Sequence, residues 1–148
     1  MDATKRQKLD TTYIRMAHTW GQLSHCNRKK VGALIVKNGM IISDGYNGTP
    51  YGFNNCCEDH VAKGTIMTEE TKWEVLHAEA NAIMKCAKHG TSCDGATLYL
   101  TMSPCKECSK LIHQAGINRV VYHEEYDDKE GIEFLNKAGI EVIVMEKI

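Results

Sequence analysis

The sequence contains no apolar run that approaches the ~20 residues needed to cross a lipid bilayer. Its polar opening, MDATKRQKLD, also has no stretch that resembles the hydrophobic region of a signal peptide. We therefore expect a cytoplasmic protein that has no membrane partner.

A strong excess of either charge is missing as well. The formal net charge is -1 at pH 7, and Arg28–Lys30 form the one dense basic cluster. Because binding to a polyanion relies on an extended basic surface, these features argue against a nucleic-acid partner. Low-complexity runs and linker-like segments are also missing, so we expect residues 1–148 to form a single domain with its own core.

Cysteine, by contrast, is abundant. The chain has seven cysteines, and in a reducing compartment such residues more often bind a metal or do redox chemistry than form disulfides. Most are scattered, whereas Cys105 and Cys108 form a CxxC pair within MSPCKEC. That pair is the first candidate for a chemical site.

Periodicity and turn signals predict the elements of an α/β fold. Helical spacing predicts a first helix over residues 9–25, with the polar residues 10–12 as candidate N-caps. Two β-rich runs, 31–36 and 40–43, flank the letters KNG and predict a hairpin. Residues 46–70 are rich in glycine, asparagine and polar side chains, which predicts a long functional loop with at most a short helix.

The rest of the chain alternates helices and strands. Helical periodicity resumes over residues 72–88, and Gly90 follows as a C-terminal stop. The next predicted elements are a strand, a helix, a strand, a helix and a strand, at residues 96–102, 105–116, 118–125, 128–139 and 140–147. This order predicts a three-layer α/β/α sandwich around a central mixed five-stranded sheet that is parallel in its second half.

His77 and Cys105 fall at predicted helix starts, where ligands gather in α/β folds. The dipole in the first turn of a helix favours thiolates at Cys105 and Cys108. One imidazole and two thiolates would hold a tetrahedral Zn²⁺ whose fourth position is free for water, which is a catalytic arrangement. Plainer interpretations stay open: the CxxC pair as half of a structural zinc site or as a redox pair, and His77 as an ordinary residue near the surface.

Glu79 favours the catalytic interpretation. A carboxylate two residues after a metal ligand can lean over the bound water and move protons to and from it. In a continuous helix, residues two apart point to nearly opposite sides. The helix must therefore begin almost at His77.

The letters HAE at 77–79 and PCKEC at 104–108 resemble the signature of the zinc-dependent nucleobase deaminases. This resemblance implies a cytidine deaminase-like fold. It also implies that His77, Cys105 and Cys108 are the zinc ligands and that Glu79 is the proton shuttle.

Within that superfamily the chain resembles the deoxycytidylate deaminases over nearly its full length. The segments that carry the likeness are VGALIVKNGMIISDGYNGTP, HAEANAIM and VVYHEEYDD. Free-nucleoside cytidine deaminases usually have cysteine at the position of His77, and tRNA adenosine deaminases usually lack the GYNG loop. The resemblance implies deamination of dCMP to dUMP and ammonia by a zinc-bound hydroxide, which supplies dUMP for thymidylate synthesis.

The same resemblance implies roles for further residues and ligands. It assigns Ala78 to the substrate site, Asn47 to the sugar and Tyr126 to the neighbourhood of the phosphate. Members of this family are commonly homohexamers that dCTP activates and dTTP inhibits, with Mg²⁺ as the companion of a triphosphate effector. Lys88 lies in the region where relatives contact the effector.

The residues themselves add two hypotheses. Arg28, with Lys29 and Lys30, offers fixed cations to a phosphate, although a solvated basic patch is an equally good interpretation. A second, structural zinc site is the other hypothesis, as some relatives possess one, against the alternative of free thiols and polar loop groups. Its candidate ligands are Cys26, Cys56, Cys57 and His60.

Two competing functions remain at this point. The same zinc chemistry could act on another base, such as a tRNA adenosine, guanine, a pteridine or a riboflavin precursor, because pocket contacts select the substrate. Alternatively, a fourth side chain such as Cys86 could close the metal site and leave a zinc-stabilised binding module without turnover.

Overall fold

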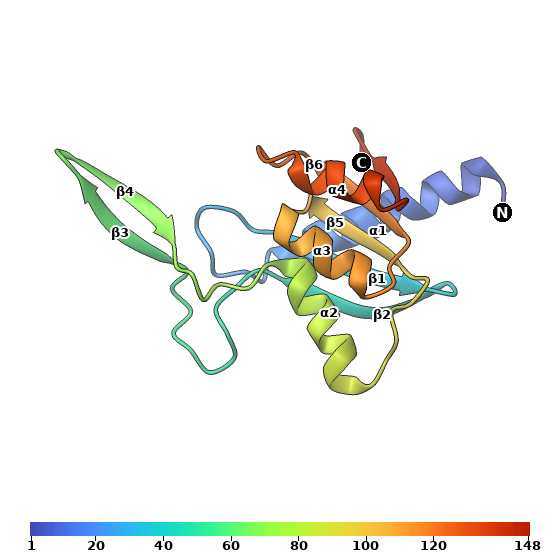
Figure 1. Cartoon of the computed structure of the whole chain (residues 1–148), viewed down its shortest axis with the longest axis horizontal. Helices are drawn as coiled ribbons and strands as arrows, with labels where there is room; N and C mark the ends of the chain where they lie inside the picture. The colour runs from blue at the N-terminus through green and yellow to red at the C-terminus, as the bar shows by residue number, and fades with distance from the viewer.

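The structure of residues 1–148, a computed structural model, has a central five-stranded sheet between helices (Figure 1). The sheet contains β1 (Gly32–Lys37), β2 (Met40–Tyr46), β5 (Thr97–Met102), β6 (Arg119–Glu124) and β7 (Glu141–Val144), in the order β2-β1-β5-β6-β7. Strand β1 is antiparallel to both of its neighbours, and β5, β6 and β7 are parallel. The helices are α1 (Ala3–Gly21), α2 (Ala78–His89), α3 (Lys106–Gln114) and α4 (Glu130–Lys137). None combines the length and the apolar composition that a membrane crossing needs.

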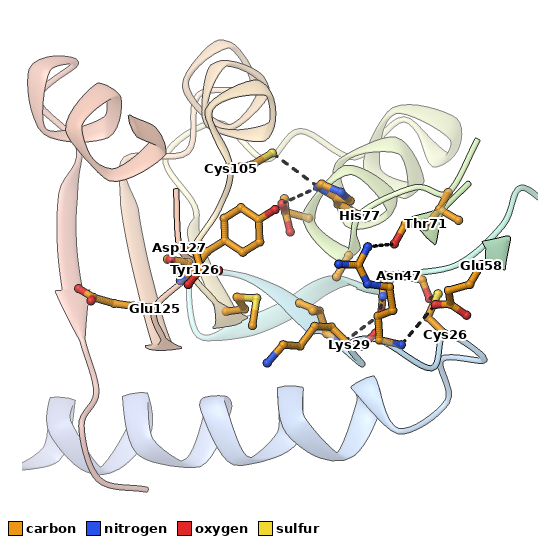
Figure 2. Close-up of a pocket in the computed structure, with 17 residues that line it drawn as sticks. Cys26, Lys29, Asn47, Glu58, Thr71, His77, Cys105, Glu125, Tyr126 and Asp127 are labelled. Carbon is orange, nitrogen blue, oxygen red and sulfur yellow. Dashed lines mark hydrogen bonds and ion pairs between the residues drawn. The ribbon is translucent and has the colours of Figure 1, made fainter. Parts of the chain in front are cut away.

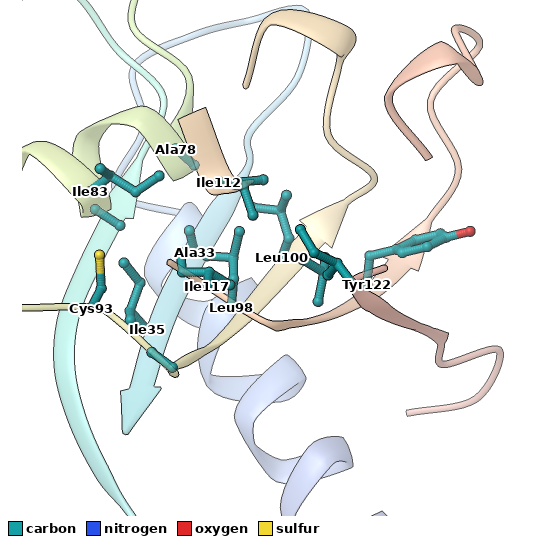
Figure 3. Close-up of a cluster of buried hydrophobic side chains, with 14 of the residues drawn as sticks. Ala33, Ile35, Ala78, Ile83, Cys93, Leu98, Leu100, Ile112, Ile117 and Tyr122 are labelled. Atoms are coloured by element: carbon teal, nitrogen blue, oxygen red, sulfur yellow. The ribbon is translucent and has the colours of Figure 1, made fainter. Parts of the chain in front are cut away.

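Alternation along the strands divides the core between the two faces of the sheet. On β1, Leu34 and Val36 pack with Ile14 and Ala17 of α1. The residues between them face the other way, because successive side chains of a strand point to opposite faces. That second face packs against α2, α3 and α4, through Ala33, Ile35, Leu98, Leu100, Ala78, Ile83, Ile112 and Leu135 (Figure 3). The predicted three-layer sandwich with a mixed five-stranded sheet is confirmed.

The first helix differs from its prediction at both ends. It begins at Ala3 rather than at residue 9, because the Asp2 side chain caps it by accepting a hydrogen bond from the backbone N–H of Lys5 at 2.9 Å. Asp10, expected as a candidate cap, lies inside the helix and is buried. Its carboxylate accepts hydrogen bonds from Arg119 Nη2 at 2.7 Å and from Tyr99 Oη at 2.6 Å.

The predicted long loop over residues 46–70 is wrong in its second half. Strands β3 (Glu58–Lys63) and β4 (Ile66–Thr71) form a separate antiparallel hairpin, which projects away from the sheet in Figure 1. We call this hairpin the ribbon. Most of its residues are exposed. Because neither strand has a buried face, the sequence shows no alternation of apolar and polar residues from which strands could be predicted.

The second helix starts at Ala78 rather than at residue 72. Residues just before it are held in an extended path by an antiparallel bridge to the loop after β2. Leu76 donates its N–H to the carbonyl of Gly48 at 2.8 Å and accepts from the N–H of Gly48 at 3.0 Å. Because that bridge uses the backbone groups of Leu76, the helix cannot begin before it.

Candidate active site

His77 is the N-cap of α2, with an extended backbone at φ -75° and ψ 157°. The condition set by the sequence, that the helix begin almost at His77, is therefore met. Glu79 lies in the first turn with its side chain 5% exposed, and its Oε1 is 3.8 Å from Nδ1 of His77. The break in helical geometry at the cap lets these two side chains, two positions apart, approach each other.

The position of α2 depends on a close approach to β2. A Cβ at Gly45 would overlap the carbonyl oxygen of Ala78, so a side chain there would push the helix away. Two side-chain hydrogen bonds hold the contact: Asn81 Nδ2 donates to the carbonyl of Tyr46 at 2.8 Å, and Ser43 Oγ donates to the carbonyl of Ala82 at 2.7 Å. The GYNG segment thus fixes the helix that carries His77 and Glu79.

Cys105 is the N-cap of α3, just beyond the end of β5. Its sulfur accepts a hydrogen bond from the backbone N–H of Cys108 at 3.4 Å. Cys108 lies one turn into the helix and is buried. Both sulfurs are therefore at a helix N-terminus, where the unpaired N–H groups and the dipole stabilise a thiolate.

The donor atoms of these residues fit a zinc ion. His77 Nδ1 lies 3.3 Å from Cys108 Sγ and 3.6 Å from Cys105 Sγ. Bond lengths of about 2.3 Å for Zn–S and about 2.1 Å for Zn–N at tetrahedral angles put such donors about 3.6 Å apart. The ligand atoms of His77, Glu79, Cys105 and Cys108 all lie within 4.8 Å of one another. The carboxylate of Glu79 is thus close enough to reach an ion held by the other three residues or a water bound to that ion.

The two thiols of the site differ in acidity: the hydrogen bond with Cys105, together with burial, raises the pKa of Cys108 far above its usual range, so that without a metal the pair shares a proton that Cys108 keeps. The hydrogen bond with Cys108 outweighs the effect of burial and, together with His77, lowers the pKa of Cys105 to about 4. Its sulfur is therefore ready to bind a metal as a thiolate. Burial raises the pKa of Glu79 above its usual range. A carboxyl group with a raised pKa can hold a proton as well as release one, which is what a proton shuttle requires.

These groups open into a cavity of about 360 Å³. His77, Glu79 and Cys105 line one side of it, which we call the catalytic side. Another part of the wall, the basic side, contains Arg28, Lys29, Glu58 and Thr71. Figure 2 shows His77 and Cys105 grouped apart from Lys29 and Glu58, with Tyr126 near the catalytic side. All four residues predicted to bind substrate line this cavity: Arg28, Asn47, Ala78 and Tyr126.

Asn47 and Tyr126 reach the cavity on constrained backbones. The Asn47 side chain donates from Nδ2 to the carbonyl of Lys29 at 2.8 Å and accepts at Oδ1 from the N–H of Val31 at 2.8 Å. Asn47 therefore also holds the chain that leads into β1. The N–H of Tyr126 donates to Ser103 Oγ at 2.7 Å, which ties the loop after β6 to the loop that carries Cys105.

The two cations of the basic side have no carboxylate partner. Neither Arg28 nor Lys29 makes an ion pair, and the one side-chain hydrogen bond of Arg28 goes from Nη1 to Thr71 Oγ1 at 3.3 Å. Lys30, by contrast, turns away and donates to the carbonyl of Ser24. The cavity therefore offers Arg28 and Lys29 to an anion.

The structure does not assemble the predicted second zinc site. Cys26 and Cys57 form a disulfide, whereas the sequence suggested zinc ligands or free thiols at these positions. Sulfurs joined to each other cannot act as two thiolate ligands. Cys56 points its sulfur at the carbonyl of Glu58, 3.2 Å away, and His60 is exposed on β3. Glu58, rather than either of these, lies close to the paired sulfurs.

Other expectations had different outcomes. Lys88 lies in the last turn of α2, at the far end of the helix from the cavity, and does not line it. Cys86 is buried in the core and does not close the metal site. Sequence reasoning missed Glu58 and Thr71 because both belong to the ribbon, and it missed Glu125 and Asp127 because nothing distinguishes them from other loop acids.

The geometry agrees with the relationships of the chain. Residues 7–124 match the model of the cytidine and deoxycytidylate deaminase zinc-binding region. The chain is 37% identical to the deoxycytidylate deaminase of Enterobacteria phage T4, over 93% of this chain and 90% of that protein.

Solved structures give the same result. The dCMP deaminase of cyanophage S-TIM5, determined in complex with dCMP and dUMP, superimposes with a TM-score of 0.86 at 44% identity, covering 98% of this chain and 99% of that one. A diaminohydroxyphosphoribosylaminopyrimidine deaminase/reductase from Thermotoga maritima is more distant, with a TM-score of 0.71 at 28% identity, covering 94% of this chain and 37% of that one. The chain belongs to the cytidine and deoxycytidylate deaminase family.

Proposed function

We propose that this protein hydrolyses dCMP to dUMP and ammonia. The observation that carries the proposal is one cavity with a three-ligand metal site and a buried carboxylate on one side and two unpaired cations on the other. The first set of groups suits attack on an amino-substituted ring, and the second suits a phosphate. The phage relatives that are named for the same reaction support this assignment.

His77, Cys105 and Cys108 would hold the zinc ion. When bound, Zn²⁺ lowers the pKa of the water in its fourth position and makes that water a nucleophile at neutral pH. Glu79 accepts a proton from the attacking water and delivers it to N3 of the cytosine ring as the oxygen adds to C4. Glu79 then passes the second proton of that water to the departing amine. Ammonia leaves and the oxygen stays at C4, which gives the uracil ring.

The residues on the basic side would select a monophosphate. Arg28 and Lys29 carry fixed positive charge and lack a carboxylate partner, so a phosphate can bind them without displacing an ion pair. Asn47 keeps a free proton on Nδ2 and a free lone pair on Oδ1 for the sugar. Tyr126, 42% exposed at the cavity wall, contacts the nucleotide near its phosphate.

Regulation and assembly form the finer part of the proposal. Family membership supports a homohexamer that is activated by dCTP and inhibited by dTTP, with Mg²⁺ bound to the triphosphate and Lys88 near the effector. Exposed apolar residues on and near the ribbon, namely Tyr51, Phe53, Ile66, Met67 and Trp73, are available to a neighbouring subunit. A second zinc would require reduction of the Cys26–Cys57 disulfide before those sulfurs could bind it.

An activity panel tests the proposal. Ammonia release is measured from dCMP, CMP, dCTP, cytidine and deoxycytidine, each with and without dCTP or dTTP as effector. We expect dCMP to be the best substrate by at least ~10-fold. Turnover of a riboflavin precursor or of a purine base in place of dCMP would assign the same zinc chemistry to another substrate. Stoichiometric zinc without turnover of any base would identify a binding module instead.

A further inference from the structure

The segment that carries Arg28 and Lys29 lies outside the regular elements. We call residues 24–31, which connect the end of α1 to β1, the basic loop. A phosphate site needs its cations in fixed positions, because ordering a long flexible side chain and its loop costs part of the binding free energy. The contacts that hold the basic loop therefore decide how well it can bind an anion.

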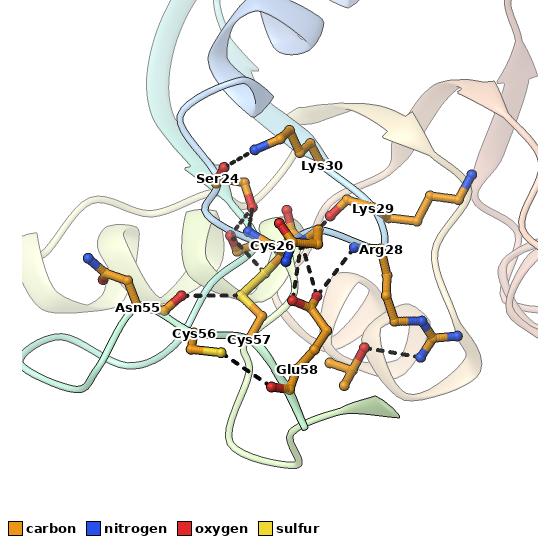
Figure 4. Close-up of a disulfide and its surroundings, with 12 residues drawn as sticks. Ser24, Cys26, Arg28, Lys29, Lys30, Asn55, Cys56, Cys57 and Glu58 are labelled. Carbon is orange, nitrogen blue, oxygen red and sulfur yellow. Dashed lines mark hydrogen bonds between the residues drawn. A yellow bond between two sulfur atoms is a disulfide. The ribbon is translucent and has the colours of Figure 1, made fainter. Parts of the chain in front are cut away.

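Glu58 makes the contacts at the middle of this loop. It is the first residue of β3 and is 4% exposed. Its carboxylate accepts hydrogen bonds from the backbone N–H of Asn27, at 3.2 Å to Oε1 and 3.1 Å to Oε2, and from the N–H of Arg28 at 3.3 Å to Oε2 (Figure 4). It forms no ion pair with any basic side chain.

A buried carboxylate without a cationic partner is costly unless its oxygens accept hydrogen bonds. Here the backbone of the basic loop supplies them. The three bonds fix the peptide groups on both sides of Asn27 and so set the direction in which the Arg28 side chain leaves the loop. In Figure 4 the Arg28 side chain extends on one side of Glu58, and Cys56 lies on the other side.

Two other contacts hold the loop on either side of Glu58. The Cys26–Cys57 disulfide joins the residue before Asn27 to the residue before Glu58. The amide of Asn47 binds the backbone at Lys29 and Val31. Glu58 is thus the one anchor whose bonds go to the backbone of Arg28 itself.

We propose that Glu58 is a positioning residue that sets the affinity of the enzyme for the phosphate of its substrate by fixing the backbone under Arg28. This inference rests on the proposed function, in which Arg28 and Lys29 bind that phosphate. Glu58 acts through the loop and not by contact with the nucleotide, because a carboxylate would repel the phosphate and its oxygens already accept the loop N–H groups.

The test compares Glu58→Gln with the wild type by steady-state kinetics on dCMP and on deoxycytidine, which has no phosphate. The amide of glutamine can accept from the loop with one oxygen only and brings its NH₂ against a backbone donor. We expect the KM for dCMP to rise about 10-fold with kcat unchanged, and kcat/KM for deoxycytidine to stay within about 2-fold. Glu69→Gln, on the exposed partner strand of the ribbon, is the matched control and should leave every constant unchanged.

A double-mutant cycle separates positioning from general support of the fold. In an Arg28→Gln background, Glu58→Gln should raise the KM for dCMP less than about 2-fold further, because the side chain that Glu58 positions is already gone. Fully additive effects, an equal loss on dCMP and deoxycytidine, or an unchanged KM would each overturn the proposal. A lower KM would also overturn it and would show that Glu58 acts by repelling the phosphate.

Two measurements keep the result interpretable. If Glu58→Gln does not fold, as judged by circular dichroism and zinc content, Glu58→Asp takes its place, since it keeps the charge but shortens the reach, and the same rise in KM without a change in kcat is required. If the wild type does not deaminate dCMP at all, the proposed function fails. If the wild type does prefer dCMP to deoxycytidine and the variants do not change that preference, only the role of Glu58 fails.

Discussion

The two sides of the cavity are built in different ways. On the catalytic side, His77, Glu79 and Cys105 stand at the first turns of α2 and α3, and the core of the sheet fixes both helices. On the basic side, Arg28 and Lys29 stand on a loop, and their neighbours Glu58 and Thr71 come from the ribbon. The first side is positioned by many packed side chains, whereas a few buried polar contacts position the second.

This difference separates chemistry from recognition. Catalytic groups must hold the reacting atoms within fractions of an ångström, which rigid helix ends achieve. A phosphate tolerates more variation in its cations, so loops can supply them and can differ between related enzymes. We expect changes on the catalytic side to affect kcat and changes on the basic side to affect the KM for dCMP. Changes in the core should affect neither constant.

The largest expected effect is at Glu79. Glu79→Gln removes the group that carries protons and should lower kcat for dCMP by about 10²–10⁴-fold. Zinc content, measured by atomic absorption, should remain one ion per chain, because the three ligands are intact. Glu133→Gln, an exposed change on α4, is the control. Loss of zinc in Glu79→Gln would make Glu79 a ligand, and normal turnover would remove it from the mechanism.

The next effect concerns stability rather than either side of the cavity. Asp10→Asn leaves the buried guanidinium of Arg119 with only the exposed carboxylate of Glu141, at 3.3 Å, as a charged partner and should lower the free energy of unfolding by about 3 kcal/mol. Chemical denaturation measures the loss. The ratio of kcat/KM for dCMP to that for deoxycytidine should not change, because this ion pair joins α1 to β6 and does not line the cavity. A changed ratio would show that the basic side senses the core.

The same pair predicts a pH dependence. Burial alone would raise the pKa of Asp10, but hydrogen bonds from Arg119 and Tyr99 and the charge of Arg119 outweigh it and hold the pKa below its ordinary 3.8. The contribution to stability is therefore present above about pH 3.8 and is lost as the pH falls through the pKa of the folded state. Asp10→Asn should remove this part of the acid destabilisation. The measurement is the free energy of unfolding of the wild type and the variant at several values from about pH 5 to about pH 2, the range in which carboxylates titrate.

A smaller effect is expected for Arg28→Gln on the basic side. Loss of one of two unpaired cations should raise the KM for dCMP about 10-fold and leave kcat unchanged. Deoxycytidine should be turned over as before. The effect should shrink as ionic strength rises, because salt screens the remaining attraction between cation and phosphate. An equal loss on both substrates would contradict a phosphate role.

The smallest expected effect is for Thr71→Val. This change removes the hydroxyl that accepts from Arg28 Nη1 but keeps the shape of the side chain. One exposed hydrogen bond contributes about 0.5–1 kcal/mol at most, so the KM for dCMP should rise about 2-fold. Thr68→Val on the same strand serves as the control. No change at all would mean that Arg28 is oriented from its backbone alone.

Much of the catalytic side could be predicted from the sequence. The proposed metal ligands and the proposed proton shuttle belong to short motifs, and the position of His77 at a helix start followed from the requirement that it meet Glu79. The order of strands and helices was predictable for a related reason. Buried segments carry apolar runs that can be recognised, and β1, β5 and β6 are buried on both faces over most of their length.

The basic side could be predicted only in part. Arg28 could be predicted because it belongs to a cluster of three basic residues. Glu58 and Thr71 could not, because they lie on a ribbon whose exposed strands carry no apolar pattern. Long-range pairs were hidden for another reason. Neither the Cys26–Cys57 disulfide nor the bond between Asp10 and Arg119 leaves a local signal, because each partner becomes meaningful only when the fold brings the two together.

The ribbon touches the body of the protein only where it begins and ends. Glu58 and Thr71 are partners in its register and both form part of the substrate cavity. The tip of the ribbon, at Gly64, projects away from the sheet, so a neighbouring molecule could bind it. Such binding could move the base of the ribbon, which lines the cavity. A partner bound there would act first on Glu58 and Thr71 at the base of the ribbon, and we expect it to change the KM for dCMP rather than kcat.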